Sequence, residues 1–442
     1  MRTPPRATRV LVILAMVAAA FAAIPVTPAL ALTSSPDSTW MTNGEVWATV
    51  QYGNVMFIGG HFSQLRDVAP GVAGANIIHA HNLAAIDMAT GQGIPTFHPD
   101  VEAVGAQSVQ VHALAMVGDK LYVGGQFGTV DGASHYNIAA VDIDPTTYAG
   151  TVDPTFTTSV GVPAAANEAK VFVYEILPGS DGLYIGGAFS KLDGKGRSKA
   201  AKITLDGTLV KTWKVTAVNG AVREMAFSTD GQSIFIAGAF NTFNGVSHQS
   251  IARVSAATGA DDPWTVSGVI VGNSSHPGMT CWSLAVTATR LFAGCGRGPN
   301  YAAAFRLDDG TNGNMAWSFG TVGNDQAIAL SADQQTLIIG GHFGTYLTQR
   351  VCGSQYLKNL GFLTNLYQTS GGVSLNCSFL PQFWGVNPFG GVWEIQVTPT
   401  AIWAGGEFHM VDCASGPAMP GYPASVACPG GHYQESIARF TL

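Results

Sequence analysis

Charged residues are scarce in this sequence of 442 residues. Asp, Glu, Lys and Arg make up 11% of the chain, and the formal net charge is −7. The Lys and Arg residues are dispersed, so the chain lacks the basic patch by which proteins hold nucleic acid. It also lacks a phosphate-binding loop, a nucleophile elbow, an HExxH motif and a Ca²⁺ loop of the EF-hand type. The sequence therefore predicts no nucleic-acid partner, no cofactor and no metal site, and it favours a non-catalytic role.

Long apolar runs are confined to the N-terminus, where Val10–Ile24 is uninterrupted by polar residues. Three arginines (Arg2, Arg6 and Arg9) precede this run and Ala29-Leu30-Ala31 follows it, which is the arrangement of a secretory signal peptide. A membrane anchor is the alternative, but Pro25 and Pro28 end a run that is shorter than the ~20 residues of a membrane span. We therefore expect a signal peptide over residues 1–31. The mature chain, residues 32–442, is expected to be secreted, to have no membrane span, and to remain free or associated with the cell surface.

Cys-x-x-Cys motifs are absent, although the chain has six cysteines. An even number of cysteines in an exported protein predicts disulfides, and the absence of CxxC pairs or nearby histidines disfavours a zinc site. Several pairings are possible, and we favour bridges between neighbours in the sequence. These are Cys281–Cys295 on consecutive expected strands, and Cys352–Cys377 and Cys413–Cys428 around two insertions.

Glycine, by contrast, is abundant, with 54 residues, and a repeated phrase contains many of them. The phrase has the form [GA]-G-x-F, as in KLYVGGQF (Lys120–Phe127). Its copies begin at Gly59, Gly124, Gly186, Ala237, Gly340 and Gly405, with a degenerate copy at Ala293. Self-similarity that persists along a whole chain is the signature of a repeat architecture.

Each copy of the phrase lies in a similar context of short β-strands. An apolar strand and a tight turn precede it, and a turn and an Ala-rich strand follow it. A further strand then carries one large aromatic residue: Phe97, Phe156, Trp213, Trp264, Trp317 or Phe379. Each unit is therefore predicted to be a four-stranded antiparallel sheet, and no long helix is predicted between units.

Four-stranded sheets repeated around an axis form a β-propeller. We expect an all-β, seven-bladed propeller that occupies residues 32–442 as a single domain, with inserted loops near 66–81, 350–361 and 412–433. The last unit ends at Leu442 after its third strand. The N-terminal segment around Trp40 is expected to supply the missing strand of the last blade, which would close the ring and cover exposed sheet edges.

The repeat, LYVGGxF followed by an N-x-A-x-x-D pattern and further glycines, resembles that of the delta-sixty-repeat β-propellers of exported bacterial proteins. The resemblance covers Trp40 to Leu442 and is weakest around Ala293. More distantly, the chain is similar to the repeats of fungal cell-surface polarity markers. The resemblance implies a propeller fold. It implies no reaction and supplies no catalytic residues, because the family is defined by its repeat.

Equivalent positions on the first strand of each unit supply the candidate ligand-binding residues. If these strands line the central channel, one position on each forms a partly aromatic ring: Trp47, His112, Tyr174, Arg223, Trp282, Gln326 and Trp393. Aromatic faces with a few hydrogen-bonding groups are typical of sugar and peptide sites. Packing between neighbouring sheets is the alternative, since large aromatic side chains usually fill cores.

Three glutamates, Glu175, Glu224 and Glu394, align one position further along these strands and could carry acid–base chemistry. The His-Ala-His of His79–His81 lies in an insertion, where a polar loop is a better interpretation than a metal site. We therefore favour a monomeric binding or scaffolding protein whose partner is an extracellular glycan, peptide or surface protein. The alternatives are a polysaccharide hydrolase or lyase that uses the channel glutamates, and a structural cell-surface protein.

Overall fold

The computed structural model describes residues 36–441, apart from 70, 105–107, 162–170, 268–278, 299, 309, 311, 321–323, 333, 335, 342–361, 368–390, 409 and 412–431. The expected signal peptide, the insertion at 350–361 and most of the insertion at 412–433 lie outside these residues. Phe379 and the four cysteines of the two expected C-terminal bridges lie outside them as well.

The described residues form β-strands and no helix. The repeated unit is an antiparallel sheet in which the first strand pairs with the second and the second with the third. The first strands are β2 (Glu45–Tyr52), β8 (Gln110–Val117), β14 (Phe172–Gly179), β19 (Val222–Phe227), β25 (Thr280–Val286), β29 (Asp325–Leu330) and β32 (Val392–Val397). The second strands are β3 (Val55–His61), β9 (Lys120–Gln126), β15 (Gly182–Ala188), β20 (Ser233–Gly238), β26 (Arg290–Gly296), β30 (Thr336–Gly341) and β33 (Ala401–Gly406). The third strands are β6 (Leu83–Asp87), β12 (Ile138–Ile143), β18 (Ala200–Ile203), β23 (Ile251–Ser255), β27 (Tyr301–Arg306), β31 (Phe362–Tyr367) and β36 (Ile437–Thr441).

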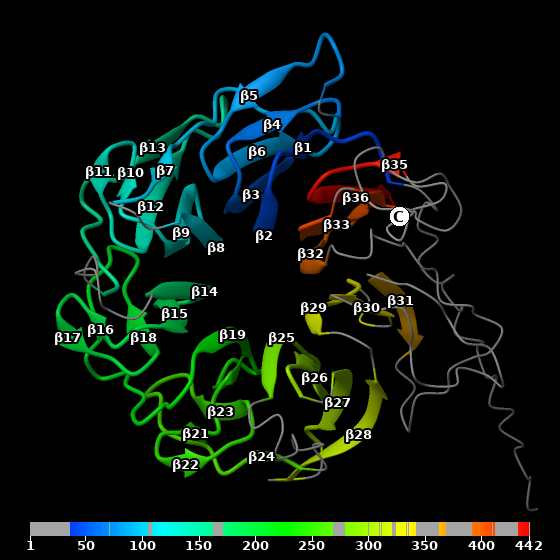
Figure 1. The fold of residues 1–442 in the computed structure, drawn as a ribbon. Helices are drawn as coiled ribbons and strands as arrows, with labels where there is room; N and C mark the ends of the chain where they lie inside the picture. Colours follow the sequence, from blue (N-terminus) through cyan, green and yellow to red (C-terminus); the bar gives the residue numbers. More distant parts are fainter. Residues whose placement is uncertain are drawn as a thin grey trace, which may run out of the picture.

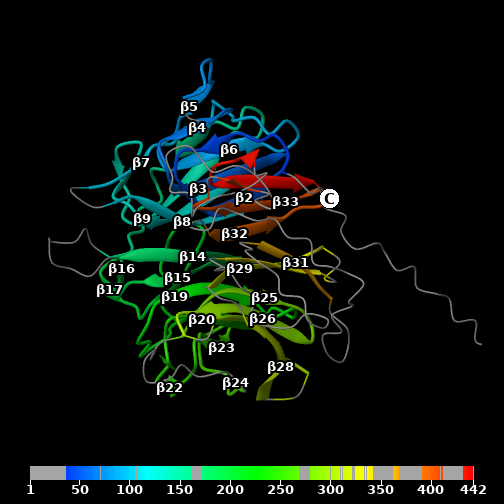
Figure 2. The same ribbon diagram turned by 45° about the vertical axis from the view of Figure 1, so that its right-hand side comes forward.

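The first strands of successive units surround a common axis (Figure 1). They pack against one another from β2 through β8, β14, β19, β25 and β29 to β32, and β32 in turn packs against β2. Apolar cores lie between neighbouring sheets: Phe57 of β3 and Val123 of β9 share one, and Val46 of β2 and Trp403 of β33 share another. Sheets that pack face to face around an axis form an all-β propeller. The insertion near 66–81 contains the hairpin of β4 (Gln64–Arg66) and β5 (Ile77–His79), which projects from the outer edge (Figure 2).

The two glycines of the repeated phrase are required by two different contacts. A Cβ on the first glycine would meet the next sheet: at Gly124 it would lie 2.6 Å from Val173 Cγ1. A Cβ on the second would meet the backbone of its own sheet: at Gly125 it would lie 1.9 Å from the carbonyl oxygen of Gln110. The first glycine therefore lets neighbouring sheets approach, and the second lets two strands approach within one sheet.

The degenerate copy of the phrase begins one residue later than the sequence alignment places it. In β26, Gly294 lies opposite Ser283, and Cys295 lies opposite Cys281. Gly294 therefore occupies the position of the first glycine and Cys295 that of the second, so the alignment on Ala293 is wrong. The cysteine disguises the repeat because it replaces a glycine with a side chain that is bonded to the facing strand.

The expected fourth strand is regular in only two of these sheets among the described residues. It forms β13 (Gly150–Val152) and β28 (Asn312–Gly320), whereas in the first, third and fourth units isolated bridges such as Ile86↔Gly93 take its place. The prediction of a regular fourth strand is therefore wrong for these three units, and in the sixth unit the expected segment lies outside the described residues. The aromatic residues of this segment are nevertheless fully buried at four positions: Phe97, Phe156, Trp213 and Trp264. A proline lies one or two residues before three of them (Pro95, Pro154 and Pro263) and lacks the N–H that would continue a ladder.

The N-terminal segment lies beside β36, the third strand of the last sheet. The backbone N–H of Asp37 donates to the carbonyl oxygen of Arg439 (2.8 Å), and the Asp37 carboxylate accepts from Arg439 Nε (2.9 Å) and Thr441 Oγ1 (2.6 Å). Residues 36–40 form no regular strand, and the N–H of Trp40 donates to Gly91 O beyond β6 (2.8 Å). We call the contacts among Asp37, Arg439 and Thr441 the Asp37 clasp.

Candidate axial binding site

A β-bulge interrupts the first strand of each unit at the same point. In β2, Val46 pairs with Gly60 and Ala48 pairs with Gly59, so Trp47 is left outside the ladder. The other first strands each leave out one residue in the same way: His112, Tyr174, Arg223, Trp282, Gln326 and Trp393. A bulge redirects the side chain of the extra residue. The bulged residues are the ring predicted from the sequence, and we call them the ring residues.

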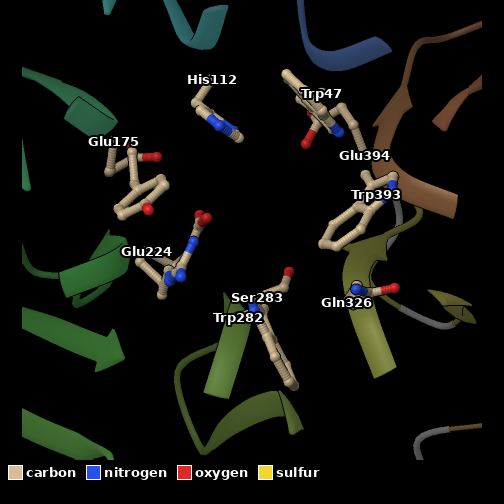
Figure 3. A pocket seen from close by; sticks show the side chains of 11 residues that line it. Trp47, His112, Glu175, Glu224, Trp282, Ser283, Gln326, Trp393 and Glu394 are labelled. Carbon is tan, nitrogen blue, oxygen red and sulfur yellow. The ribbon is translucent and has the colours of Figure 1, made fainter. Parts of the chain in front are cut away.

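All the ring residues line one cavity of about 100 Å³, the axial cavity. Figure 3 shows His112, Glu175 and Glu224 on one side of it and Trp47, Trp393 and Glu394 on the other. The predicted aromatic residues are partly exposed in this cavity and are not buried in the cores between sheets. That they bind a ligand stays a prediction.

The three aligned glutamates, Glu175, Glu224 and Glu394, also line the axial cavity, as predicted. Ser283 lines it too and was missed. It follows Trp282 in β25 as each glutamate follows its ring residue, so the same alignment could have identified it.

Four successive ring residues contact one another through their rings and the Arg223 guanidinium. The rings of Trp47 and His112 are nearly parallel with centroids 4.6 Å apart, and His112 meets Tyr174 edge-on at 5.1 Å. The guanidinium carbon of Arg223 lies 3.8 Å from the centre of the Tyr174 ring. Aromatic and cation–π contacts of this kind orient the side chains that make them, so this part of the cavity wall is preorganised.

Burial raises the pKa of all three glutamates. The pKa of Glu394 is raised to about 7, although the hydrogen bond that Thr49 Oγ1 donates to its Oε1 (3.3 Å) lowers it. Burial and then the charge of Glu394 raise the pKa of Glu175. Burial, followed by the charges of Glu175 and Glu394, raises the pKa of Glu224 well above its usual value. Carboxyl groups that hold protons near neutral pH suit acid–base chemistry or proton-linked binding.

The two basic side chains of the axial cavity differ in charge. Burial and the nearby charge of Arg223 lower the pKa of His112 to about 3, so its imidazole is neutral at neutral pH. Burial also lowers the pKa of Arg223, but a guanidinium stays protonated in proteins. Arg223 is therefore the one cation among the residues that line this cavity.

A second cavity, of about 430 Å³, lies between the first and last sheets. Its lining includes Glu45 and His61 of the first sheet and Glu407, which follows β33. Burial and the charge of Glu407 raise the pKa of Glu45, while the charge of His61 lowers it. The Nδ1 atom of His61 lies 2.7 Å from the carbonyl oxygen of Val109. No sequence pattern indicates this cavity, because its residues come from opposite ends of the chain.

The remaining predicted residues lie apart from both cavities. His81 lies 3.5 Å from Asp100 and 3.7 Å from Glu102 at the surface. Within the described ranges, no group of three or more His, Cys, Asp or Glu residues is placed to hold a metal ion. The same part of the chain contains no helix long and apolar enough to cross a membrane.

One of the three predicted disulfides lies in the described residues. Cys281 of β25 and Cys295 of β26 face each other across the ladder and are bonded, as predicted. The pairs Cys352–Cys377 and Cys413–Cys428 lie outside the described residues, so these bridges stay predictions.

In the comparisons with known proteins, a sequence match covers only a short part of the chain. The model of a family described as a domain of unknown function (DUF5122) β-propeller matches residues 179–209, which include β15 and β18. No curated protein matches the sequence. Among solved structures, the WD40 β-propeller domain of Doa1 is 11% identical with a TM-score of 0.45, covering 92% of this chain and 96% of that one. Sqt1 from Chaetomium thermophilum is 15% identical with a TM-score of 0.45, covering 92% and 90%. The extracellular domain of BT4673 from B. thetaiotaomicron is 10% identical with a TM-score of 0.43, covering 92% of this chain and 40% of that one.

The family match and the arrangement of sheets agree on the class of fold. The matched segment spans parts of one repeated sheet, and its family is a β-propeller, so the predicted all-β propeller is confirmed. Membership of the delta-sixty-repeat family stays a prediction. The solved structures share 15% identity or less with this chain, and they say nothing of its ligand.

Proposed function

We propose that this protein is a secreted, non-catalytic binding propeller with seven blades. The repeated sheets are the blades, residues 32–442 form a single domain, and residues 1–31 are a signal peptide. The Asp37 clasp and the core shared by Val46 and Trp403 support a ring closed between the first and last blades. The ligand is an extracellular glycan, peptide or surface protein that presents a small terminal group to the axial cavity.

The bulges are the observation that carries this proposal. Each one takes a ring residue out of the strand ladder, and all the ring residues line one cavity. Packing of the fold does not require this, because the cores that contain Phe57 and Val46 include none of the ring residues. Bulges near functional sites commonly serve to direct a side chain. A few polar groups among aromatic walls are what a ligand pocket contains.

The volume of the axial cavity limits what can enter it. At about 100 Å³ it is smaller than the roughly 150 Å³ engineered cavity that admits one benzene molecule. A sugar ring is larger than benzene, so a whole saccharide chain does not fit inside. A side chain or a small substituent at the end of a larger ligand does.

Glycan and peptide arrays test this proposal with the purified protein and two variants. Trp393→Leu removes an aromatic wall of the axial cavity, and Glu102→Gln changes an exposed carboxylate as a control. We expect ligands that bind the unchanged protein and the control equally, and that bind Trp393→Leu at least about tenfold more weakly. Ligands that Trp393→Leu retains in full, or a complete absence of ligands, would contradict the proposal.

A polysaccharide hydrolase or lyase is the second candidate, and the raised pKa values of the cavity glutamates favour it. A protonated glutamate near neutral pH can act as a general acid for a leaving sugar oxygen, while a second carboxylate acts as base or nucleophile. Release of reducing ends from a panel of polysaccharides, between about pH 5 and 8, would test it. Turnover that falls at least about a hundredfold in both Glu394→Gln and Glu224→Gln would support an enzyme. No turnover of any polysaccharide would exclude it for that panel.

A further inference from the structure

Among the residues that the structure describes, the glutamates of the axial cavity have no cationic partner. The groups that act on Glu175, Glu224 and Glu394 are one another and the hydroxyl of Thr49. In the part of the chain that the structure describes, no Lys or Arg forms an ion pair with them. Carboxylates enclosed by protein are normally paired with a cation or give up their charge. A positively charged ligand would therefore supply the counter-charge for these carboxylates.

The charge balance of the cavity also favours a cation. Its three carboxyl groups outnumber the single guanidinium of Arg223, which is already stacked on the Tyr174 ring at 3.8 Å, and a bound cation would favour the ionised form of these carboxyl groups. His112 is neutral at neutral pH. The other ionisable groups on the first strands are Glu45, Tyr52, Tyr174 and Asp325, and Arg297, His61 and Glu407 lie near these strands.

The aromatic walls point to an organic cation in particular. The indole faces of tryptophan attract ammonium groups within about 6 Å, and cages of aromatic side chains bind methylated amines. We propose that the axial cavity binds an organic ammonium group, a primary or methylated amine, among the indoles of Trp47, Trp282 and Trp393 and the carboxylates of Glu175, Glu224 and Glu394. This inference rests on the proposed binding function and names the chemical class of its ligand.

The size of the axial cavity fits this class. A volume of about 100 Å³ suits an ammonium head on an alkyl chain, which has few heavy atoms. A bare metal ion fits less well, since no three His, Cys, Asp or Glu side chains converge on one point among the residues described. Two sources offer the same chemistry: a free small amine, and the lysine side chain of an extracellular peptide.

Isothermal titration calorimetry with three probes tests the inference. The probes are n-butylammonium as a free amine, N-acetyl-lysine amide as a peptide-like amine, and n-butanol as a neutral analogue of similar length. At about pH 8, where Glu394 is largely ionised, we expect at least one ammonium probe to bind about tenfold or more tightly than n-butanol. Tighter binding of butylammonium identifies a small amine as the source, and tighter binding of the lysine amide identifies a peptide.

Proton release provides an independent measurement on the unchanged protein. The pKa of Glu394 is about 7, so a cation that binds the ionised carboxylate displaces protons at and below that pH. Affinity should therefore increase as the pH rises from about 6 to 8. The apparent binding enthalpy at pH 7 should differ between phosphate and HEPES, whose ionisation heats differ, in the sense of protons released to the buffer.

A matched pair of variants locates the site. Glu394→Gln keeps the shape of the side chain and removes its charge, and we expect about a tenfold loss of affinity for the ammonium probe and a smaller proton release. Glu102→Gln, at the exposed end of β7 (Val101–Glu102), should bind as the unchanged protein does. If Glu394→Gln fails to fold, the comparison with n-butanol and the proton release still decide the question.

Several results would overturn the inference. They are equal binding of n-butanol and the ammonium probes, no binding of either ammonium probe at millimolar concentration, and an affinity that neither pH nor Glu394→Gln alters. A neutral saccharide that binds in a Trp393-dependent manner while the amines do not would overturn this inference and leave the proposed function intact. Amine binding that Trp393→Leu leaves unchanged would place the amine site elsewhere and refute the inference as stated.

Discussion

The paired glycines of the repeated phrase lead to a sharp prediction about stability. In Gly125→Ala the new Cβ would lie 1.9 Å from the carbonyl oxygen of Gln110, far inside the ~3.5–4.0 Å of comfortable nonbonded contacts. Both atoms belong to backbone that is held by the ladder between β8 and β9, so neither can rotate away. Overpacking against movable side chains costs about 1–3 kcal/mol, and we expect this substitution to cost about 3 kcal/mol or more.

Two further variants calibrate that value. In Gly124→Ala the contact is a side chain, Val173 Cγ1 at 2.6 Å, so a cost of about 1–3 kcal/mol is expected. A Cβ on Gly196 would have no other atom within 4 Å, and Gly196→Ala should change the free energy of unfolding by less than about 0.5 kcal/mol. The three free energies come from urea denaturation followed by circular dichroism. If Gly125→Ala unfolds at the same urea concentration as Gly196→Ala, the reasoning about backbone contact is refuted.

Three other perturbations have defined outcomes. Replacement of both Cys281 and Cys295 by alanine should lower the free energy of unfolding by about 3 kcal/mol, because the bridge closes a loop with a sequence separation of 14; an unchanged urea midpoint would contradict this. The pKa of Glu394 is raised from 4.5 to about 7, so between these two pH values the folded state keeps a proton that the unfolded chain has released. The free energy of unfolding should therefore fall as the pH rises through this window, by up to about 1.4 kcal/mol per pH unit. Glu394→Gln should remove that part of the slope in denaturation curves measured at pH 5, 6 and 7, and equal slopes in both proteins would refute the assignment. Asp37→Asn should weaken the Asp37 clasp and lower the free energy of unfolding by about 1–2 kcal/mol. A change of less than half that value would count against a role of the clasp in closing the ring.

The repeats made the fold class and the ring residues predictable. The phrase recurs on the second strand of each unit, so an alignment of copies also aligns the first strands, and Trp47 falls on the same position as Trp393. Equivalence within a repeat is a local property that a sequence records directly. The bulge itself carried no separate signal, yet it occurs where the alignment had placed the ring.

The errors and omissions came from features that the repeats do not share. Cys295 replaces a glycine and shifted the alignment of one copy by a residue. Pro95 and Pro263 interrupt the segments expected to be fourth strands in the first and fourth units, a local rule that the count of strands overlooked. The cavity of Glu45 and Glu407, and the mutual influence of the three cavity glutamates, depend on distances across the ring that no spacing in the chain expresses.

The bulges also bear on how this molecule can change. A bulged residue lies outside the register of the ladder, so its replacement leaves the ladder hydrogen bonds on both sides intact. The backbone already carries tryptophan, histidine, tyrosine, arginine and glutamine at these equivalent positions. Mutational tolerance should therefore be high at the ring residues and low at the glycines that face them. Evolution, or a display library, could then alter recognition one position at a time while the ability to fold is preserved.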